Sequence, residues 1–172
     1  CTGSGCLAIL LAHAYPNAEV DAADISPDAL AVAQRNVSDY ELDGRINLVR
    51  SDLFANLPEK NYDLIISNPP YVNAIAMETL PAEYRHEPAL ALAGGEDGLD
   101  AVRTLLREAP RFLNHGGLLV VEVGHNRAAV EAAWADVLSP PARPQHGWDT
   151  YRAPDIPPGT PTPVDPRDPR TR

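Results

Sequence analysis

Residues 1–24 read CTGSGCLAILLAHAYPNAEVDAAD, a glycine-rich turn that leads into an apolar helix-length segment and then into a strand-like segment. Good helix formers fill positions 6–14, and Pro16 follows them as a helix-ending residue. We expect residues 18–24 to form a strand that closes on Asp24. This order of turn, helix and strand is typical of folds in which strands and helices alternate.

The same alternation continues through the first 138 residues. A second helix is expected from Ser26 to Ser38, with Ser26 as its N-cap and Pro27 in its first turn. We expect further strands over 45–50, 62–67 and 118–123 and further helices over 99–113 and 126–138. Alternating elements imply right-handed crossovers and a mostly parallel sheet covered by helices on both faces, a Rossmann-like α/β fold.

Composition excludes several classes of protein. The 172 residues are 44% hydrophobic and 22% charged, which suits one globular domain, and no apolar run is long enough to span a bilayer. The net charge of −10 argues against a domain that grips nucleic acid through phosphates. Cys1 and Cys6 are too few for a disulfide framework or a four-ligand metal site, so we expect no metal and a reducing, cytoplasmic location.

The chain changes character after Leu138. Residues 139–172 contain 10 of the 18 prolines, five Arg and four Asp, with almost no aliphatic residues. We therefore expect a domain over 1–138 and a disordered, Pro-rich tail over 139–172. Within that tail, only residues 148–151 have the aromatic side chains needed to dock on the domain.

Three features are expected at the edge of the sheet where ligands bind in such folds, beyond the carboxyl ends of the strands. Gly3 and Gly5 allow the backbone to approach a ligand at the start of a helix. Asp24 lies 19 residues after Gly5, the spacing at which an acid binds ribose hydroxyls, and Asp52 closes the next strand, where it can accept from adenine. Together they indicate a nucleoside-bearing cofactor. The pattern Gly3-x-Gly5-x-x-Ala8 also matches a dinucleotide-binding fingerprint, so NAD is an alternative cofactor.

The tetrapeptide Asn68-Pro69-Pro70-Tyr71 follows the strand expected over 62–67. A proline after Asn68 favours an extended conformation for Asn68, so that its side chain projects from the strand end. The two prolines fix φ and supply no N–H, which leaves the Pro69 carbonyl without a local partner. The Asn68 side-chain oxygen and this carbonyl form a pair of acceptors beside the Tyr71 ring, which complements a planar –NH₂ group.

With the glycine turn and Asp24, this tetrapeptide resembles the S-adenosylmethionine-dependent methyltransferases that modify amino groups of amides or adenine. Several segments narrow the resemblance to the protein-glutamine methyltransferases, in the branch that acts on the ribosomal large-subunit protein L-three: DISPDAL (24–30), SDLF (51–54), SNPPYV (67–72), LPAEYRHEP (80–88) and GGEDGLD (94–100). The resemblance covers residues 1 to about 124.

The resemblance implies S-adenosylmethionine as cofactor and a glutamine of a ribosomal protein as substrate. Cofactor contacts are implied for Gly3, Gly5, Asp24, Ile25, Asp52, Leu53 and Asn68. Asn68 and Pro69 would accept both hydrogens of the glutamine amide, with Pro70 in the same substrate-binding segment and Tyr71 packed beside it. Asn68, Pro69 and Tyr71 are therefore the expected catalytic residues.

Two other functions share parts of this pattern. An adenine-amino DNA methyltransferase would also use the tetrapeptide, but the acidic composition and the lack of a basic target-reading segment argue against it. A cofactor-binding module without catalysis would keep the glycine turn and Asp24. His86, between Arg85 and Glu87, has the side chain of a base, but a charge cluster that contacts the partner is the more frequent role of such a loop residue.

The sequence also departs from the family pattern at both ends. The glycine turn stands at residue 1, so the strand that precedes it in the family is missing, and a slot is expected between the strands at 18–24 and 62–67. The antiparallel hairpin that ends the fold is expected after Leu138, where the Pro-rich tail stands instead. The connection over 72–98 is long for a loop, and we expect it to contact the substrate protein.

Overall fold

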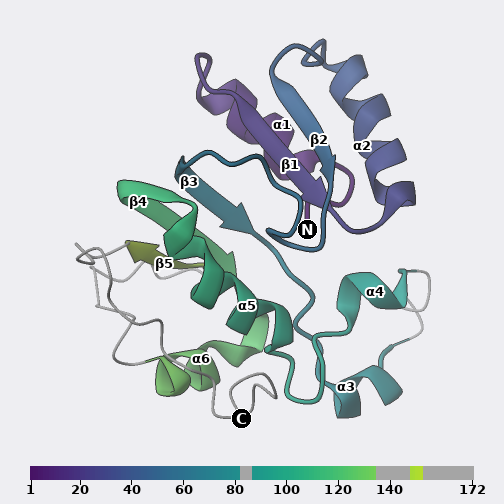
Figure 1. The fold of residues 1–172 in the computed structure, drawn as a ribbon. Helices are drawn as coiled ribbons and strands as arrows, with labels where there is room; N and C mark the ends of the chain where they lie inside the picture. The colour runs from purple at the N-terminus through teal and green to yellow at the C-terminus, as the bar shows by residue number, and fades with distance from the viewer. Residues whose placement is uncertain (82–86, 135–147, 153–172) are drawn as a thin grey trace.

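The computed structural model describes residues 1–81, 87–134 and 148–152, the last of these through their backbone (Figure 1). Within these ranges the chain has the α/β architecture that its sequence indicates, with two parallel strand pairs and helices packed against them. The strands do not form one continuous sheet. They form a two-stranded sheet in the N-terminal part and a three-stranded sheet in the C-terminal part.

The N-terminal part consists of α1 (Cys6–Ala14), β1 (Val20–Asp24), α2 (Pro27–Asp39) and β2 (Ile46–Arg50). β1 and β2 are parallel and in register along their whole length. One apolar cluster joins the two helices to the two strands through Ala8, Ile9, Ala12, Ala22, Val37, Leu42 and Ile46. As expected, Ser26 is the N-cap of α2, and its Oγ accepts from the Ala29 N–H at 3.2 Å.

The C-terminal part is built on β3 (Tyr62–Ser67), β4 (Leu113–Glu122) and β5 (Trp148–Arg152). β3 runs parallel to β4, and β5 runs antiparallel to β4 on its other side. A second apolar cluster joins β4 to two helices, α5 (Asp100–Glu108) and α6 (Arg127–Ala133), with Leu119 and Val102 fully buried. Each part of the molecule therefore has its own core.

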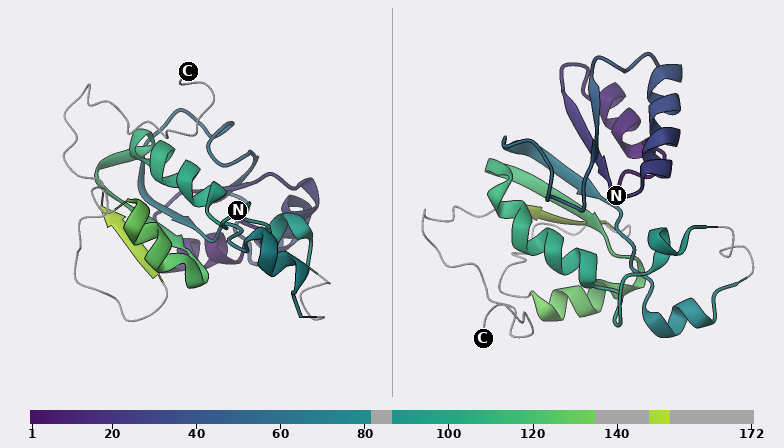
Figure 2. Two further views of the ribbon diagram at one scale, coloured as in Figure 1. Left: turned by 90° about the horizontal axis from the view of Figure 1, so that it is seen from below. Right: turned by 45° about the vertical axis from the view of Figure 1, so that its right-hand side comes forward.

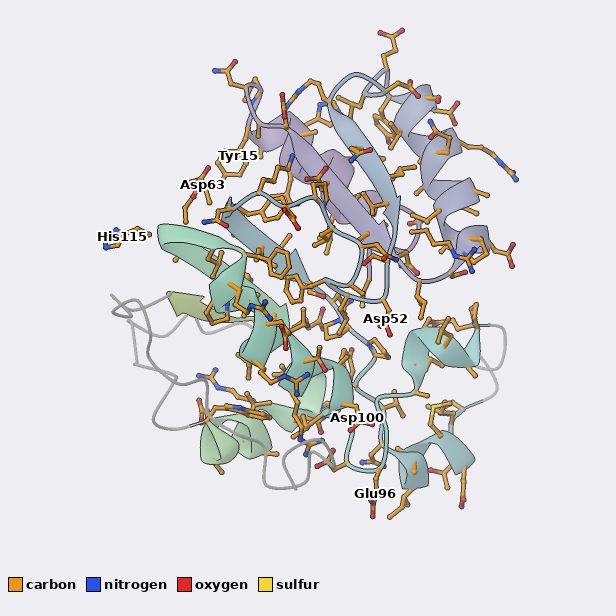
Figure 3. The ribbon with its side chains drawn as sticks, in the orientation of Figure 1. Tyr15, Asp52, Asp63, Glu96, Asp100 and His115 are labelled. Atoms are coloured by element: carbon orange, nitrogen blue, oxygen red, sulfur yellow. The ribbon has the colours of Figure 1, made fainter. Side chains whose placement is uncertain are left out.

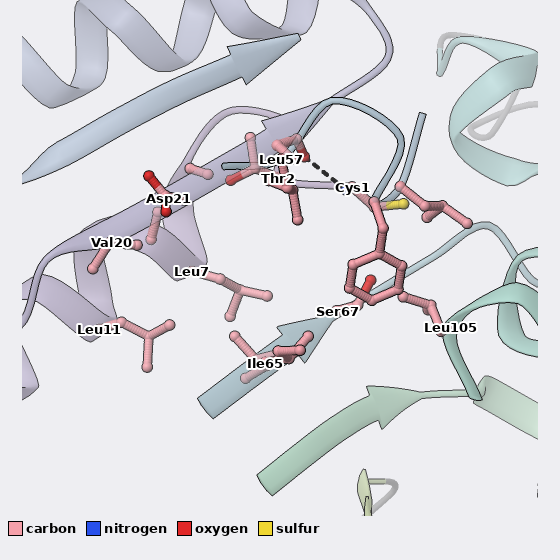
Figure 4. Close-up of a pocket in the computed structure, with 16 residues that line it drawn as sticks. Cys1, Thr2, Leu7, Leu11, Val20, Asp21, Leu57, Ile65, Ser67 and Leu105 are labelled. Atoms are coloured by element: carbon pink, nitrogen blue, oxygen red, sulfur yellow. Dashed lines mark hydrogen bonds between the residues drawn. The ribbon is translucent and has the colours of Figure 1, made fainter. Parts of the chain in front are cut away.

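β1 and β3 face each other across the gap between the two sheets without pairing (Figure 1). A cavity of about 110 Å³ lies between them. Figure 4 shows Leu7 and Leu11 of α1 on one side of it and Ile65 of β3 on the other. This cavity occupies the place where the sequence predicts a slot between two strands.

Several boundaries differ from the sequence-based expectations. The connection over 72–98 is not a plain loop, because it contains α3 (Ala74–Glu78) and α4 (Ala89–Leu92). Asn73 caps α3 by accepting from the Ala76 N–H at 2.8 Å. Figure 2 shows that α3 and α4 project together away from the two sheets.

The helix expected over 99–113 is shorter than predicted. α5 ends at Glu108 and is followed by a 3₁₀ turn, η2 (Ala109–Arg111), because Pro110 has no N–H with which to continue the helix. β4 then starts at Leu113, earlier than expected, with an irregular register between Tyr62 and Leu64 of its neighbour β3.

The tail was expected to be disordered, with only residues 148–151 able to dock, and disorder is wrong for residues 148–152. These five residues form β5, which pairs with Leu118–Glu122 of β4. They contain no proline and lie at the edge of the sheet, where a Pro-rich neighbourhood is tolerated. Residues 135–147 and 153–172 lie outside the described part of the chain, as does the end of the helix expected over 126–138.

Candidate functional site

A cavity of about 880 Å³ opens at the carboxyl ends of β1, β2 and β3. This volume lies in the range of small-molecule and cofactor sites, roughly 300–1,000 Å³. The wall is formed by the glycine turn, the segments that follow the three strands, α4 and the start of α5. Figure 3 shows Asp52 on the side of the β1–β2 sheet and Asp100 on the α5 side of this region.

The two glycines of the turn have different tasks. Both have a left-handed backbone, with φ of +55° at Gly3 and +82° at Gly5. A Cβ on Gly3 would meet nothing within 4 Å, and Gly3 lines the cavity. A Cβ on Gly5 would lie 3.2 Å from the Cβ of Ala33 in α2, and Gly5 is not among the lining residues. Gly5 therefore serves the packing of α1 against α2.

Asp24 fixes the turn from the end of β1. Its carboxylate is buried and accepts two backbone bonds, from the Gly3 N–H to Oδ2 at 2.8 Å and from the Ser26 N–H to Oδ1 at 3.0 Å. Each carboxylate oxygen has a further lone pair, so Asp24 can still accept from hydroxyl groups in the cavity that it lines. This is the arrangement that a ribose requires.

The segment after β2 carries a strained residue. Leu53 has a φ of +48°, a left-handed conformation that is unfavourable for a branched side chain. The buried Ser51 holds this turn, because its Oγ donates to the Leu53 carbonyl at 2.8 Å and accepts from the Asn56 N–H at 2.9 Å. Leu53, the exposed Asp52 and the exposed Ile25 all line the cavity, which gives apolar surface and an acceptor for an adenine.

The tetrapeptide after β3 is divided between the cavity and the interior. Asn68 is exposed and lines the cavity together with Pro70. Pro69 is fully buried, and the half-buried Tyr71 ring lies against Gly124, beyond the end of β4. Neither Pro69 nor Tyr71 is among the lining residues, so the structure brings Asn68 and Pro70, but not these two, together with Gly3.

Sequence reasoning missed the far wall of the cavity. It is formed by Glu87 and Leu90 at α4 and by Asp100 and Thr104 on α5. Gly95, with a φ of +92°, packs directly against the Asp100 carboxylate, where no side chain would fit. The available signal was the glycine- and acid-rich segment over 94–100, immediately before a helix at the ligand-binding edge.

Acidic side chains dominate the cavity wall. Five carboxylates line it, from Asp24, Asp28, Asp52, Glu87 and Asp100. Among the described lining residues there is no Lys, Arg or His side chain. The field in the cavity therefore favours cationic ligands and disfavours phosphates.

The side chains with shifted pKa values lie at the opposite ends of β1 and β3. Burial opposes ionisation of Asp21, but hydrogen bonds from Lys60, Asn47 and Tyr62 outweigh it and lower the pKa of the carboxyl group. The Lys60 Nζ lies 2.8 Å from Asp21 Oδ2, and the Tyr62 hydroxyl donates to the same oxygen at 2.8 Å. Burial and this bond to a carboxylate raise the pKa of Tyr62. These contacts join the two sheets.

The residues present fit S-adenosylmethionine. The open space above Gly3 allows the amino-acid portion of the cofactor to lie close to the backbone, and Asp24 offers acceptors for ribose hydroxyls. Leu53 and Ile25 offer apolar faces, and the acidic wall suits a cationic ligand. In the described ranges, no group of three or more His, Cys, Asp or Glu residues could hold a metal ion. His86 lies outside the described residues.

Comparison with known proteins finds methyltransferases. Residues 1–83 match the family model of the methyltransferase small domain. The chain is 59% identical over 137 residues to the ribosomal protein uL3 glutamine methyltransferase of Neisseria meningitidis serogroup A, which covers 80% of this chain and 45% of the relative. The corresponding protein of Burkholderia pseudomallei is 60% identical over 141 residues, covering 78% and 46%. The chain spans a little under half the length of these curated relatives.

Solved structures resemble the fold at low sequence identity. A methyltransferase from Pyrococcus furiosus aligns with a TM-score of 0.59 and 19% identity, covering 88% of this chain and 71% of the other. The ribosomal protein L11 methylase from Lactobacillus delbrueckii subsp. bulgaricus aligns with a TM-score of 0.53 and 23% identity, covering 87% and 64%. These alignments confirm the expected fold class.

The fold is therefore that of the class I S-adenosylmethionine-dependent methyltransferases. By sequence, the chain is similar to the ribosomal protein uL3 glutamine methyltransferases over about four fifths of its length. This confirms the family resemblance that its motifs carry. No helix in the described residues is long and apolar enough to cross a membrane.

Proposed function

We propose that the chain binds S-adenosylmethionine in the 880 Å³ cavity and transfers its methyl group to the side-chain amide nitrogen of a glutamine in ribosomal protein uL3. The observation that carries this proposal is the position of Asn68, which is exposed on the wall of the cavity that Gly3 and Asp24 also line. Names of the curated relatives support the substrate.

At the cofactor end, the chain would hold the ligand chiefly through the N-terminal part. Gly3 passes beside the amino-acid portion, with Gly5 shaping the turn behind it, and Asp24 accepts from the ribose. Asp52, Leu53 and Ile25 border the adenine. When bound, the cofactor supplies an electrophilic methyl group on a positively charged sulfonium that is its own leaving group.

At the substrate end, the acceptor segment solves a chemical difficulty. An amide nitrogen is a poor nucleophile because its lone pair is shared with the carbonyl group. The Asn68 side-chain oxygen would accept an N–H group, which orients the nitrogen and stabilises the positive charge that develops on it. The Pro69 carbonyl, the second acceptor that the sequence predicts, belongs to a buried residue outside the cavity wall. Pro70 lines the entrance and Tyr71 supports the segment. An N-methylated, positively charged amide is strongly acidic, so its proton can leave to water without a dedicated base.

The substrate protein would be recognised at α3, α4 and the surrounding connection over 72–98. Ile75 and Leu90 project from these helices with exposed fractions of 78% and 57%. A protein that binds ribosomal RNA neutralises phosphates with Lys and Arg, and such a basic surface suits the acidic wall of the cavity. A ribosomal substrate also implies action in the cytoplasm, and the net charge of −10 argues against direct binding of nucleic acid.

The test is transfer of a radiolabelled methyl group from S-adenosylmethionine, with purified uL3 and adenine-containing DNA offered in parallel. We expect label in uL3, at a glutamine, and none in DNA. Label in DNA would instead support the adenine-amino activity. Cofactor binding in calorimetry without transfer to either substrate would identify a binding module and would overturn the proposed reaction. Binding of NAD in the same cavity would overturn the cofactor assignment.

A further inference from the structure

Tyr71 is seated on the end of β4 rather than in the cavity. A Cβ on Gly124, the first residue of η3 (Gly124–Asn126), would lie 2.5 Å from Cε2 and 2.8 Å from Cδ2 of the Tyr71 ring. Gly124 also has a left-handed backbone, with a φ of +54°. Any side chain at this position would displace the ring, so the glycine provides the surface on which Tyr71 rests.

Asn126 holds the backbone of the same tyrosine. Its Nδ2 donates to the Tyr71 carbonyl at 2.8 Å and to the Gly98 carbonyl at 3.5 Å. The backbone N–H of Asn126 donates to the Val123 carbonyl at 3.0 Å, which anchors Asn126 to the strand end. One side-chain amide thus connects the segment after β3, the loop before α5 and the end of β4.

Two further glycines close around Tyr71. A Cβ on Gly94 would lie 2.8 Å from the Tyr71 Cα. A Cβ on Gly98, which has a φ of +80°, would collide with the Tyr71 carbonyl and lie 2.8 Å from Asn126 Nδ2. We call Gly94, Gly98, Gly124 and Asn126 the Tyr71 seat. Its members come from two distant segments, and their close approach leaves the tyrosine backbone little room to move.

We propose that Asn126 is a positioning residue for methyl transfer, which acts by fixing the Tyr71 carbonyl and thereby the direction of Asn68. Asn126 does not line the cavity, so it can act only through the tetrapeptide. Pro69 and Pro70 have fixed φ values, so fewer backbone torsions between Tyr71 and Asn68 are free to absorb a displacement of Tyr71. This inference rests on the proposed function, in which Asn68 orients the substrate amide.

The first test compares Asn126→Ala and Asn126→Asp in the 172-residue chain. Asp keeps the size of the side chain but has no N–H to donate at neutral pH. We expect both variants to lower kcat for uL3 methylation by about 10- to 100-fold, the range for a small misplacement of a substrate-orienting group. The Kd for S-adenosylmethionine should stay at the wild-type value, because the cofactor-lining residues are untouched.

Asn114→Ala is the matched control. Asn114 lies near the start of β4, far from the Tyr71 seat, and its Nδ2 donates to the Asp63 carboxylate at 2.8 Å. This variant loses a hydrogen bond donated by an asparagine side chain away from the tetrapeptide, and it should keep wild-type kcat. Gly124→Ala displaces the Tyr71 ring but keeps the Asn126 amide, and it should also lower kcat. Equal kcat in the Asn126 variants and the control would overturn the proposal.

Hydrogen exchange supplies a measurement that does not depend on methyl transfer. The Val72 N–H donates to the Leu92 carbonyl at 2.9 Å, and the Gly94 N–H donates to the Val72 carbonyl at 2.8 Å. Loss of Asn126 should reduce the protection of both amides, whereas loss of Asn114 should not. If the wild-type chain transfers no methyl group, the proposed function fails. Hydrogen exchange still tests whether Asn126 positions the segment. Unchanged protection of Val72 and Gly94 in Asn126→Ala would overturn the positioning role.

Discussion

The two sheets support the two ends of one cavity in different ways. In the N-terminal part, the cofactor turn is held by contacts close in sequence, such as the bond from Gly3 to Asp24, 21 residues apart. In the C-terminal part, the acceptor segment is held by contacts from far along the chain, such as the bond from Asn126 to Tyr71, 55 residues apart. The cofactor end is therefore formed by residues near one another in the sequence, whereas the substrate end depends on contacts between distant segments.

This difference implies that the two ends can be disabled separately. Each sheet has its own apolar cluster, and the side chains that connect the sheets, Asp21 with Lys60 and Tyr62, lie away from the cavity. A substitution in one part should therefore change either cofactor binding or the proposed methyl transfer and spare the other. Four predictions follow this division, and only the last concerns the connection between the parts.

Asn68→Ala should have the largest effect. Removing one preorganised group that contacts the reacting atoms costs about 10²- to 10³-fold in kcat, and we expect a loss of that size in methyl transfer to uL3. The Kd for S-adenosylmethionine should change little, because Gly3, Asp24 and Leu53 remain in place. Single-turnover transfer and calorimetry measure the two quantities. Full turnover by this variant would refute the role of Asn68, and Asn114→Ala again serves as the control.

Asp24→Asn should show the complementary effect on the cofactor end. A hydrogen bond to a charged group contributes about 1.5–3 kcal/mol, so we expect the Kd for S-adenosylmethionine to rise about 10- to 100-fold. At saturating cofactor, kcat should fall much less. Asp28→Asn is the control, because this exposed residue lines the same cavity without bonding the glycine turn. Calorimetry measures the Kd. Similar changes in both variants would show that the effect of Asp24→Asn comes only from the loss of one negative charge.

Gly5→Ala should lower stability rather than affinity. The left-handed conformation costs a side-chain-bearing residue about 1–2 kcal/mol, and the new Cβ would press on Ala33 at 3.2 Å. We expect the free energy of unfolding in urea to fall by at least that amount. Gly44→Ala is the control, because a Cβ there meets nothing within 4 Å and its φ is not left-handed. A loss of cofactor affinity without a loss of stability would show instead that Gly5 contributes to the cofactor site.

Asp21→Asn should have the smallest effect, and a pH-dependent one. Because the folded state lowers the pKa of Asp21, ionised Asp21 stabilises the fold above its ordinary value of 3.8, and this contribution is lost as pH falls through the lower folded value. The variant should be less stable than wild type at pH 7, by less than about 1 kcal/mol since the pair is partly exposed. The difference should shrink in thermal melts below about pH 4.

Asp63→Asn is the control for this last prediction, since Asp63 is an exposed neighbour that bonds Asn114 within the C-terminal part. It should not reproduce the pH dependence of Asp21→Asn. A difference between wild type and Asp21→Asn that stays constant from pH 7 to pH 3 would show that the connection between the sheets does not depend on the charge of Asp21.

Much of the cofactor end could be read before the structure was known. Of the residues expected to contact the cofactor, all except Gly5 line the cavity: Gly3, Asp24, Ile25, Asp52, Leu53 and Asn68. Their signals are local, since a left-handed glycine, an acid at a strand end and a residue before proline each depend on a few neighbours. Gly5 carried the same local signal, and only its contact with Ala33 shows that it faces a helix.

The substrate end was readable only in part. Asn68 and Pro70 line the cavity as the motif predicts, but the seat of Tyr71 and the wall formed by α4 and α5 had no counterpart in the sequence reasoning. The strand β5 was likewise missed, because its pairing with β4 joins residues about 30 positions apart through a Pro-rich segment. Such contacts depend on which segments meet after folding.

The sequence by itself determined the alternation of strands and helices, the family and the residues that can present acceptors or a close backbone. These follow from the conformational preferences of short segments, which depend on neighbouring residues alone. Tertiary structure alone decided that Tyr71 turns away from the cavity onto Gly124, that Asn126 holds it there, and that carboxylates from four segments face one space. The physical reason is that these relations arise from packing between distant segments, whose closure no local preference encodes.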